Sequence, residues 1–145
     1  MKPSPEHRSR YARFVEITTR WMDNDVYGHV NNVVYYSFFD TAINQLLIEE
    51  GILNLESREL IGLVVDTQCS YFRAIAFPDR VRAGIRVAHV GATSVRYEIG
   101  LFRNGEETAS AQGHFVHVYV GRQENRPKML PEELRAFAAR LTCPS

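Results

Sequence analysis

Cysteine, long apolar runs and an excess of charge of either sign are all scarce in this chain. Its 145 residues include two cysteines, Cys69 and Cys143, too few to suggest a disulfide framework or a metal knuckle. No apolar run approaches the roughly 20 residues of a membrane span. Seventeen acidic residues balance seventeen basic ones, so there is no global field to attract nucleic acid or a membrane surface. Any anionic ligand is therefore expected to bind a local basic cluster.

The N-terminus also lacks the apolar core of a secretory signal. Residues 1–10 are polar and contain Pro3 and Pro5, which predicts a loose head before a single domain over residues 11–145. A domain of this length buries about 70% of its unfolded surface and needs no disulfide or metal to fold. Together these features predict a reduced, cytoplasmic protein.

Alternation of apolar residues with period two predicts five strands. They are expected at residues 11–22, 60–77, 81–87, 95–101 and 108–120. Gly91 to Thr93 is a turn, and Asn104-Gly105 is a strong signal for a tight hairpin. Short connections make neighbouring strands antiparallel.

One long helix is predicted between the first two strands. Asn31 or Asn32 can cap its first turn, and Gly51 is a suitable C-terminal stop. The helix is apolar around most of its circumference, so it should be buried on more than one side. A short helix is expected from Pro131 to about Leu141. The predicted fold class is thus α+β, with one long buried helix wrapped by a five-stranded antiparallel sheet.

The segment from Asp23 to Tyr35 gathers acid, imidazole and amide side chains just before the long helix. The first-turn amides of a helix are unpaired and lie at the positive end of its dipole, so they can stabilise an oxyanion. A carboxylate in the preceding loop can activate water or attack a carbonyl itself. The segment therefore has the minimum equipment for acyl transfer to water.

Asp25, the run from Gly28 to Asn32, and Tyr35 form the pattern Asp-x-x-Gly-His-Val-Asn-Asn-x-x-Tyr. This pattern resembles the signature of hotdog-fold thioesterases of the 4-hydroxybenzoyl-CoA thioesterase type. The resemblance spans roughly residues 11–134 and includes the long apolar helix and the strand pattern at residues 66–73. It also includes the tail Arg126-Pro127-Lys128 and Leu130 to Leu134.

The resemblance implies an acyl-CoA thioesterase that needs no metal or organic cofactor. It implies that Asp25 is the nucleophile or general base, and that the backbone amides of Asn32 and Val33 polarise the thioester carbonyl. Gly28 and Tyr35 are expected beside them in the substrate site. His29 aligns with the catalytic histidine of plant acyl-carrier-protein thioesterases and is a second catalytic candidate.

Other interpretations remain open on the sequence alone. Tyr27 occupies the position of the catalytic asparagine of the carrier-protein enzymes, which favours coenzyme A but leaves a carrier-protein thioester as an alternative. A non-catalytic acyl-CoA binding module is a further alternative, because fold does not determine function. Asp23, Asp25 and His29 could ligate a metal, but no second cluster completes such a site.

The resemblance also implies a homodimer or homotetramer in which sheets pair edge to edge and the active site lies at the dimer boundary. A covered edge is physically reasonable, since an open sheet leaves unpaired edge strands. Coenzyme A carries phosphates, for which arginine forks and lysines are suitable partners. The candidates are Arg73, Arg103, Arg122, Arg126 and Lys128.

Overall fold

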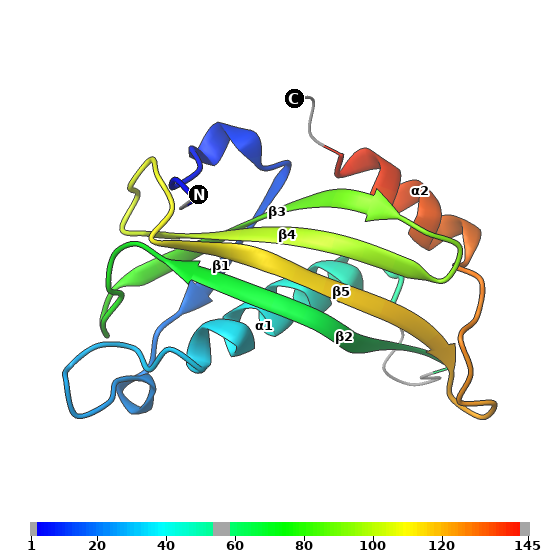
Figure 1. Cartoon of the computed structure of the whole chain (residues 1–145), viewed down its shortest axis with the longest axis horizontal. Coiled ribbons are helices and arrows are strands. Elements are labelled where there is room, and N and C mark those ends of the chain that lie inside the picture. Colours follow the sequence, from blue (N-terminus) through cyan, green and yellow to red (C-terminus); the bar gives the residue numbers. More distant parts are fainter. Residues whose placement is uncertain (1–2, 54–58, 143–145) are drawn as a thin grey trace.

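A computed structural model describes residues 3–53 and 59–142 of the chain, and its main elements are a five-stranded sheet and two α-helices (Figure 1). The strands are β1 (Arg13–Thr18), β2 (Leu60–Tyr71), β3 (Arg80–Val90), β4 (Ser94–Arg103) and β5 (Ala111–Gly121). The helices are α1 (Val34–Glu49) and α2 (Glu132–Arg140), with single 3-10 turns η1 (Arg8–Arg10) and η2 (Trp21–Asp23) near the N-terminus.

All neighbouring strands are antiparallel, in the order β1-β3-β4-β5-β2. The long helix α1 lies across one face of this sheet (Figure 1). This is the hotdog arrangement, and it confirms the predicted fold class. Among the described residues, neither helix is both long and apolar enough to cross a bilayer.

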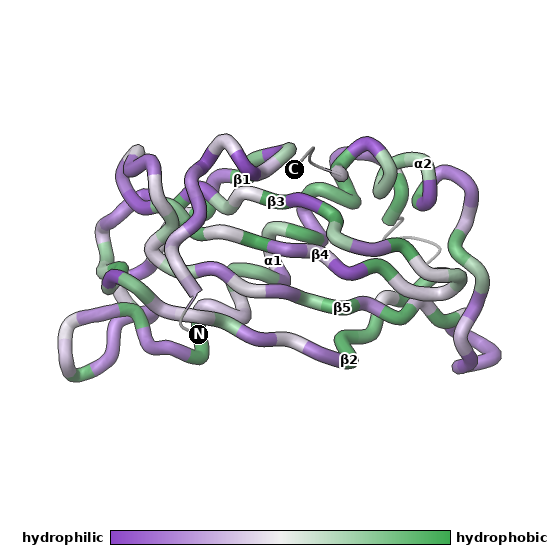
Figure 2. Tube along the Cα trace, turned by 45° about the horizontal axis from the view of Figure 1, so that its top comes forward, coloured by the Kyte–Doolittle hydropathy of each residue, from purple (hydrophilic) through white to green (hydrophobic). Residues whose placement is uncertain are grey.

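The core lies between α1 and the sheet face turned toward it. Odd-numbered residues of the central strands point to this face, so hydrophobic and hydrophilic residues alternate along them (Figure 2). On α1 the buried positions are Tyr35, Phe38, Phe39, Ala42, Ile43, Leu46 and Leu47. The helix is thus buried on the side that faces the sheet, and an outer stripe that includes Asp40 and Ile48 is exposed, so the predicted burial on more than one side is not found among the described residues of the single chain.

Four predicted strand boundaries are wrong by three residues or more. The third strand runs on to Val90 and does not end at Val87. The first strand stops at Thr18 because Trp21 to Asp23 form a 3-10 turn. The second ends at Tyr71 and not near Phe77, because the amides of Phe72 and Arg73 both turn to the carbonyl of Ser110. The fifth begins at Ala111 and not at Thr108, whose one ladder contact is an isolated bridge to His7.

The N-terminal residues make contacts from Ser4 onward. The Ser4 carbonyl accepts from the Gln112 side chain. The Glu6 amide donates to the Gln112 side chain, and the Glu6 carbonyl accepts from the Ala109 amide. Tyr11 packs over Gly100 on the sheet face away from α1. This segment therefore lies across the back of the sheet.

The edge strand β2 is apolar and exposed in its middle. Leu63, Val64 and Val65 are 45%, 44% and 59% exposed, and the register with β5 shifts between Val64 and Asp66. An exposed apolar edge is a template for pairing with another chain.

Candidate active site

The loop that carries Asp25 is a small closed hairpin. Asn24 and Val30 form an antiparallel bridge, and the Asp25 amide donates to the His29 carbonyl at 2.9 Å. The Gly28 amide donates to the Asp25 carbonyl at 3.0 Å, with Gly28 at φ 81°. A tight turn followed by a left-handed glycine is a common way to close a short hairpin. Because Asp25 and His29 face each other across it, their side chains lie on the same face.

The hairpin is anchored to the segment that follows β2. The Val30 amide donates to the Ile75 carbonyl at 2.7 Å, and the Asn24 side chain accepts from the Phe77 amide at 3.0 Å. Asp23, only 2% exposed, accepts from the Arg20 amide at 2.8 Å and from its guanidinium at 3.0 Å. Asp23 therefore holds the loop in place and is not presented to a ligand.

The Asp25 carboxylate is half-buried and only partly engaged. One of its oxygens accepts from the Tyr27 amide at 2.9 Å. Its other oxygen has no partner within residues 3–53 and 59–142, and neither has the exposed imidazole of His29. A carboxylate oxygen oriented by the backbone but free on one side can accept a proton from water or approach a carbonyl carbon.

The first turn of α1 begins beside this loop. Asn31 orients the residues that lead into α1, since its side-chain oxygen accepts from the Val33 amide at 3.1 Å and its carbonyl from the Val34 amide at 2.9 Å. The backbone N–H of Asn32 has no acceptor among the described residues. Of the two backbone amides that the sequence suggested for an oxyanion, that of Asn32 is unoccupied within the described residues and that of Val33 is bonded to the Asn31 side chain.

An open pocket of about 500 Å³ joins these groups. Its lining residues come from the loop, from the start of α1 and from the end of β2: Asp25, Tyr27, His29, Val30, Asn32, Tyr35, Tyr71, Phe72, Arg73 and Ala74. Five residues proposed from the sequence are thus brought together here: Asp25, His29, Asn32, Tyr35 and Arg73. Gly28 and Val33 do not line the pocket, although Gly28 shapes the loop.

Two tyrosines close the pocket on the β2 side. The ring of Tyr35, which is 3% exposed, meets that of Tyr71 edge-on at 4.9 Å, and the Tyr35 hydroxyl accepts from the Ile75 amide at 3.2 Å. Burial raises the pKa of Tyr35, so it stays neutral. Tyr71 was not a sequence candidate, because a residue at the end of a strand 46 positions after Asp25 carries no local signal of belonging to this site.

The basic candidates fall into two groups. Arg73 donates to the Thr108 carbonyl and hydroxyl at 2.6 and 2.8 Å, and Arg103 donates to Glu106 at 3.0 Å. These two arginines brace the loop before β5. Arg122 and Lys128 instead line a separate pocket of about 510 Å³ together with Glu59, Gln123 and Glu124, and Arg126 does not line it.

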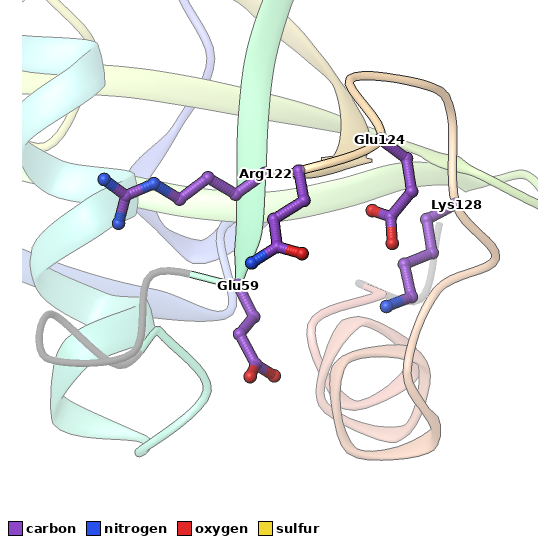
Figure 3. A pocket seen from close by; sticks show the side chains of 5 residues that line it. Glu59, Arg122, Glu124 and Lys128 are labelled. Carbon is purple, nitrogen blue, oxygen red and sulfur yellow. The ribbon is translucent and has the colours of Figure 1, made fainter.

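This second pocket lies where β2 starts and β5 ends, at the opposite end of the sheet from Asp25 (Figures 1 and 3). In Figure 3 the Lys128 and Glu124 side chains extend on the same side, whereas Arg122 points away from them. Over the described residues there is no cluster of three or more histidine, cysteine, aspartate or glutamate side chains that would suit a metal ion.

Comparison with known proteins agrees with this geometry. The family model of the thioesterase-like superfamily matches residues 19–138. The PA5185 protein from Pseudomonas aeruginosa strain PAO1 is 51% identical, with a TM-score of 0.93 over 97% of this chain and 98% of that one. The PA2801 protein of Pseudomonas aeruginosa is 28% identical, with a TM-score of 0.80 over 88% of this chain and 98% of that one.

A DHNA-CoA thioesterase from Staphylococcus aureus is 19% identical, with a TM-score of 0.75 over 88% of this chain and 86% of that one. At this identity the similarity concerns the fold alone. The family match carries more weight, because it covers 120 of the 145 residues, including the loop of Asp25 and all of α1. It supports thioester hydrolysis as the general activity: the chain belongs to the thioesterase-like superfamily.

Proposed function

We propose that the chain hydrolyses acyl-CoA thioesters to the free acid and coenzyme A, in the manner of the 4-hydroxybenzoyl-CoA thioesterase type. The proposal rests on two polar groups of residues that line one pocket and that have no partner among the described residues. They are one carboxylate oxygen of Asp25 and the backbone N–H of Asn32. The first can supply or activate the nucleophile, and the second lies at the positive end of α1, where negative charge is stabilised.

The reaction has two possible routes through Asp25. In one, the carboxylate takes a proton from water, and the resulting hydroxide attacks the thioester carbon. In the other, the carboxylate attacks that carbon directly, and water then hydrolyses the mixed anhydride. In both routes the carbonyl oxygen gains negative charge opposite the Asn32 amide, the C–S bond breaks and coenzyme A leaves as the thiolate.

His29 and Tyr35 support these steps in the proposal. His29 lies on the same face of the hairpin as Asp25 and is solvent-accessible, so it can orient the water or the acyl group. Tyr35 forms the buried wall against which the acyl group rests. Gly28 acts through the backbone, by closing the turn that presents Asp25.

We further propose that two copies pair along β2. The 12 residues of this strand span about 40 Å at roughly 3.3 Å per residue, with the Asp25 pocket at its end and the pocket of Arg122 and Lys128 at its start. Antiparallel pairing of two β2 edges is isologous. It brings the start of one β2 beside the end of the other, so each copy lends its basic pocket to the partner's active site.

This arrangement favours Lys128 and the neighbouring Arg126 over Arg73 as partners of the coenzyme A phosphates. Arg73 already donates two hydrogen bonds to Thr108, whereas the Arg126 side chain has no partner among the described residues. A cytoplasmic location belongs to the same proposal, since Cys69 is a free thiol.

The test is thiol release from a panel of short-chain, long-chain and aryl acyl-CoAs by the wild type and by Asp25→Asn. Loss of a general base lowers kcat by about 10²- to 10⁴-fold, and that decrease is expected for Asp25→Asn. Asp40→Asn is the matched control, because Asp40 lies on the exposed face of α1 and, within the described part of the chain, its side chain bonds only Asn44. It should stay within twofold of wild type.

Three outcomes would contradict the proposal. An Asp25→Asn variant within threefold of wild type removes Asp25 from the mechanism. Turnover of an acyl-carrier-protein thioester at a higher rate than the same acyl group on coenzyme A assigns a different carrier. Tight binding of acyl-CoA without turnover makes the chain a binding module.

A further inference from the structure

Tyr71 connects the end of β2 to the first turn of α1. It lines the active-site pocket with Asp25 and Asn32, and its hydroxyl donates to the Asn32 carbonyl at 2.9 Å. The hydrogen bond spans 39 positions of the sequence and therefore depends on the fold.

Tyr71 is held both at its backbone and at its ring. Its backbone pairs with Ala111 in the ladder between β2 and β5. Its ring meets Tyr35 edge-on, at 4.9 Å and 76°, and Tyr35 is itself buried and bonded to the Ile75 amide. The position of the Tyr71 hydroxyl is therefore set by the β2–β5 ladder and by the buried ring of Tyr35 on α1.

The peptide group between Asn32 and Val33 is consequently held from two sides. Tyr71 bonds its carbonyl, and the Asn31 side chain accepts from its N–H at 3.1 Å. A planar trans peptide held at both polar atoms cannot rotate without breaking one of these bonds. The Asn32 N–H belongs to the preceding peptide group, which is joined to this one at the Asn32 Cα atom, so only the φ and ψ rotations of Asn32 separate the two planes.

We propose that Tyr71 is a positioning residue for the oxyanion-binding backbone N–H of Asn32 at the start of α1. The inference rests on the proposed function. Tyr71 does not contact the reacting atoms in this role. It acts through the Asn32 carbonyl, by holding the peptide plane next to the Asn32 N–H.

The hydroxyl remains a donor at every working pH. Burial, with smaller contributions from the neighbouring Cys69 and Tyr36, raises the pKa of Tyr71 above its ordinary value. The ring is still 42% exposed, so the side chain can be changed without disturbing the core.

The experiment compares kcat and KM of wild type, Tyr71→Phe and Tyr97→Phe on the best acyl-CoA of the panel. We expect Tyr71→Phe to lower kcat about tenfold, less than the 10²- to 10³-fold for a lost direct donor, with KM within twofold. The split is expected because amides hold the oxyanion of the transition state more strongly than the ground-state carbonyl. Tyr97→Phe also loses a tyrosine hydrogen bond, that to Tyr119 at 2.8 Å in the core, and should leave kcat unchanged.

Several results would overturn the role of Tyr71. These are a kcat within twofold of wild type, a raised KM at unchanged kcat, or an equal loss of kcat in Tyr97→Phe. A decrease in kcat that accompanies a change in molar mass by light scattering would also overturn it, since Tyr71 lies on the β2 edge. Absence of wild-type turnover is a separate result, seen before any variant is measured, and it removes the proposed function together with this role.

Discussion

Gly28 and Gly51 both adopt a left-handed backbone, for different purposes. Gly28 has φ 81° in the loop that presents Asp25, and Gly51 has φ 74° just after α1. An added Cβ would meet no atom within 4 Å at either position. The cost of a side chain at either glycine is therefore backbone strain alone, which makes the two positions a matched pair.

We predict that Gly28→Ala and Gly51→Ala each lower the free energy of unfolding by about 1 kcal/mol, because a left-handed conformation costs a residue with a Cβ about that much. Only Gly28→Ala should also lower kcat, by about tenfold or more, since a small displacement of Asp25 disturbs the reacting geometry. Urea denaturation and thiol release measure the two effects. Equal activity losses in both variants would contradict a local role for Gly28.

A buried histidine makes stability depend on pH. His117 is 2% exposed among the rings of Tyr97, Phe115 and Tyr119, and its Nδ1 shares a hydrogen bond of 3.2 Å with the Tyr119 hydroxyl. Burial lowers the pKa of His117 from 6.5 to about 4. Below pH 6.5 the unfolded chain takes up a proton that the folded chain refuses, so stability falls as the pH falls toward 4.

We predict that this histidine alone removes about 2 kcal/mol of stability between pH 7.5 and pH 5.0, from the difference in its two pKa values. In His117→Phe this contribution should vanish, and the loss on acidification should shrink by the same amount. His114→Gln is the control, because His114 lies on the opposite face, bonded to Asp66 at 2.9 Å. Urea denaturation at the two pH values gives the result, and identical pH dependence in wild type and His117→Phe would refute it.

At the scale of elements, local signals predicted what they encode and missed what distant contacts impose. The positions of α1 and of the Asn104–Gly105 turn follow from apolar periodicity and from residues that accept positive φ, and both are found where the sequence indicated. The end of β2 at Tyr71 was missed, since it depends on hydrogen bonds from Phe72 and Arg73 to Ser110, almost 40 positions away. Alternation continues past Tyr71, but the pairing partner does not.

The candidate site divides in the same way. Asp25, Gly28, His29, Asn31 and Asn32 lie within eight positions of one another, so a local motif could reveal them. Tyr71 and Ala74 reach the pocket from the far end of β2, and no pattern in the sequence links them to Asp25. The motif suggested the backbone amides of both Asn32 and Val33 as oxyanion donors. In the structure the Asn31 side chain already accepts from that of Val33.

At the scale of the whole molecule, the outer edge of β2 has no partner strand among the described residues of the single chain. Three consecutive apolar residues, Leu63 to Val65, are exposed there, and burial of such area is favourable at about 25 cal/mol per Å². The other edge strand, β1, has only six residues, and its exposed positions include Arg13 and Glu16. The β2 edge is therefore the expected site of pairing.

We predict that Val65→Lys separates the proposed dimer and reduces activity with it. Val65 lies at the middle of β2, so in an antiparallel pair two introduced lysines meet near the symmetry axis, where like charges repel. Light scattering of the purified protein reports the molar mass. Ala88→Lys, at an exposed position of β3, should keep the mass of wild type. A Val65→Lys protein with unchanged mass would place the interface elsewhere.

The sequence by itself determined the periodic elements, the α+β class and the loop of Asp25, because strand alternation, helix caps and turn glycines act over a few residues. Only the tertiary structure decided that the Tyr71 hydroxyl bonds the Asn32 carbonyl just before α1, and that the basic pocket lies at the far end of the sheet from Asp25. These relations depend on strand order and register. They arise from packing across the whole sheet, whose energy is shared among residues far apart in the chain and leaves no local pattern.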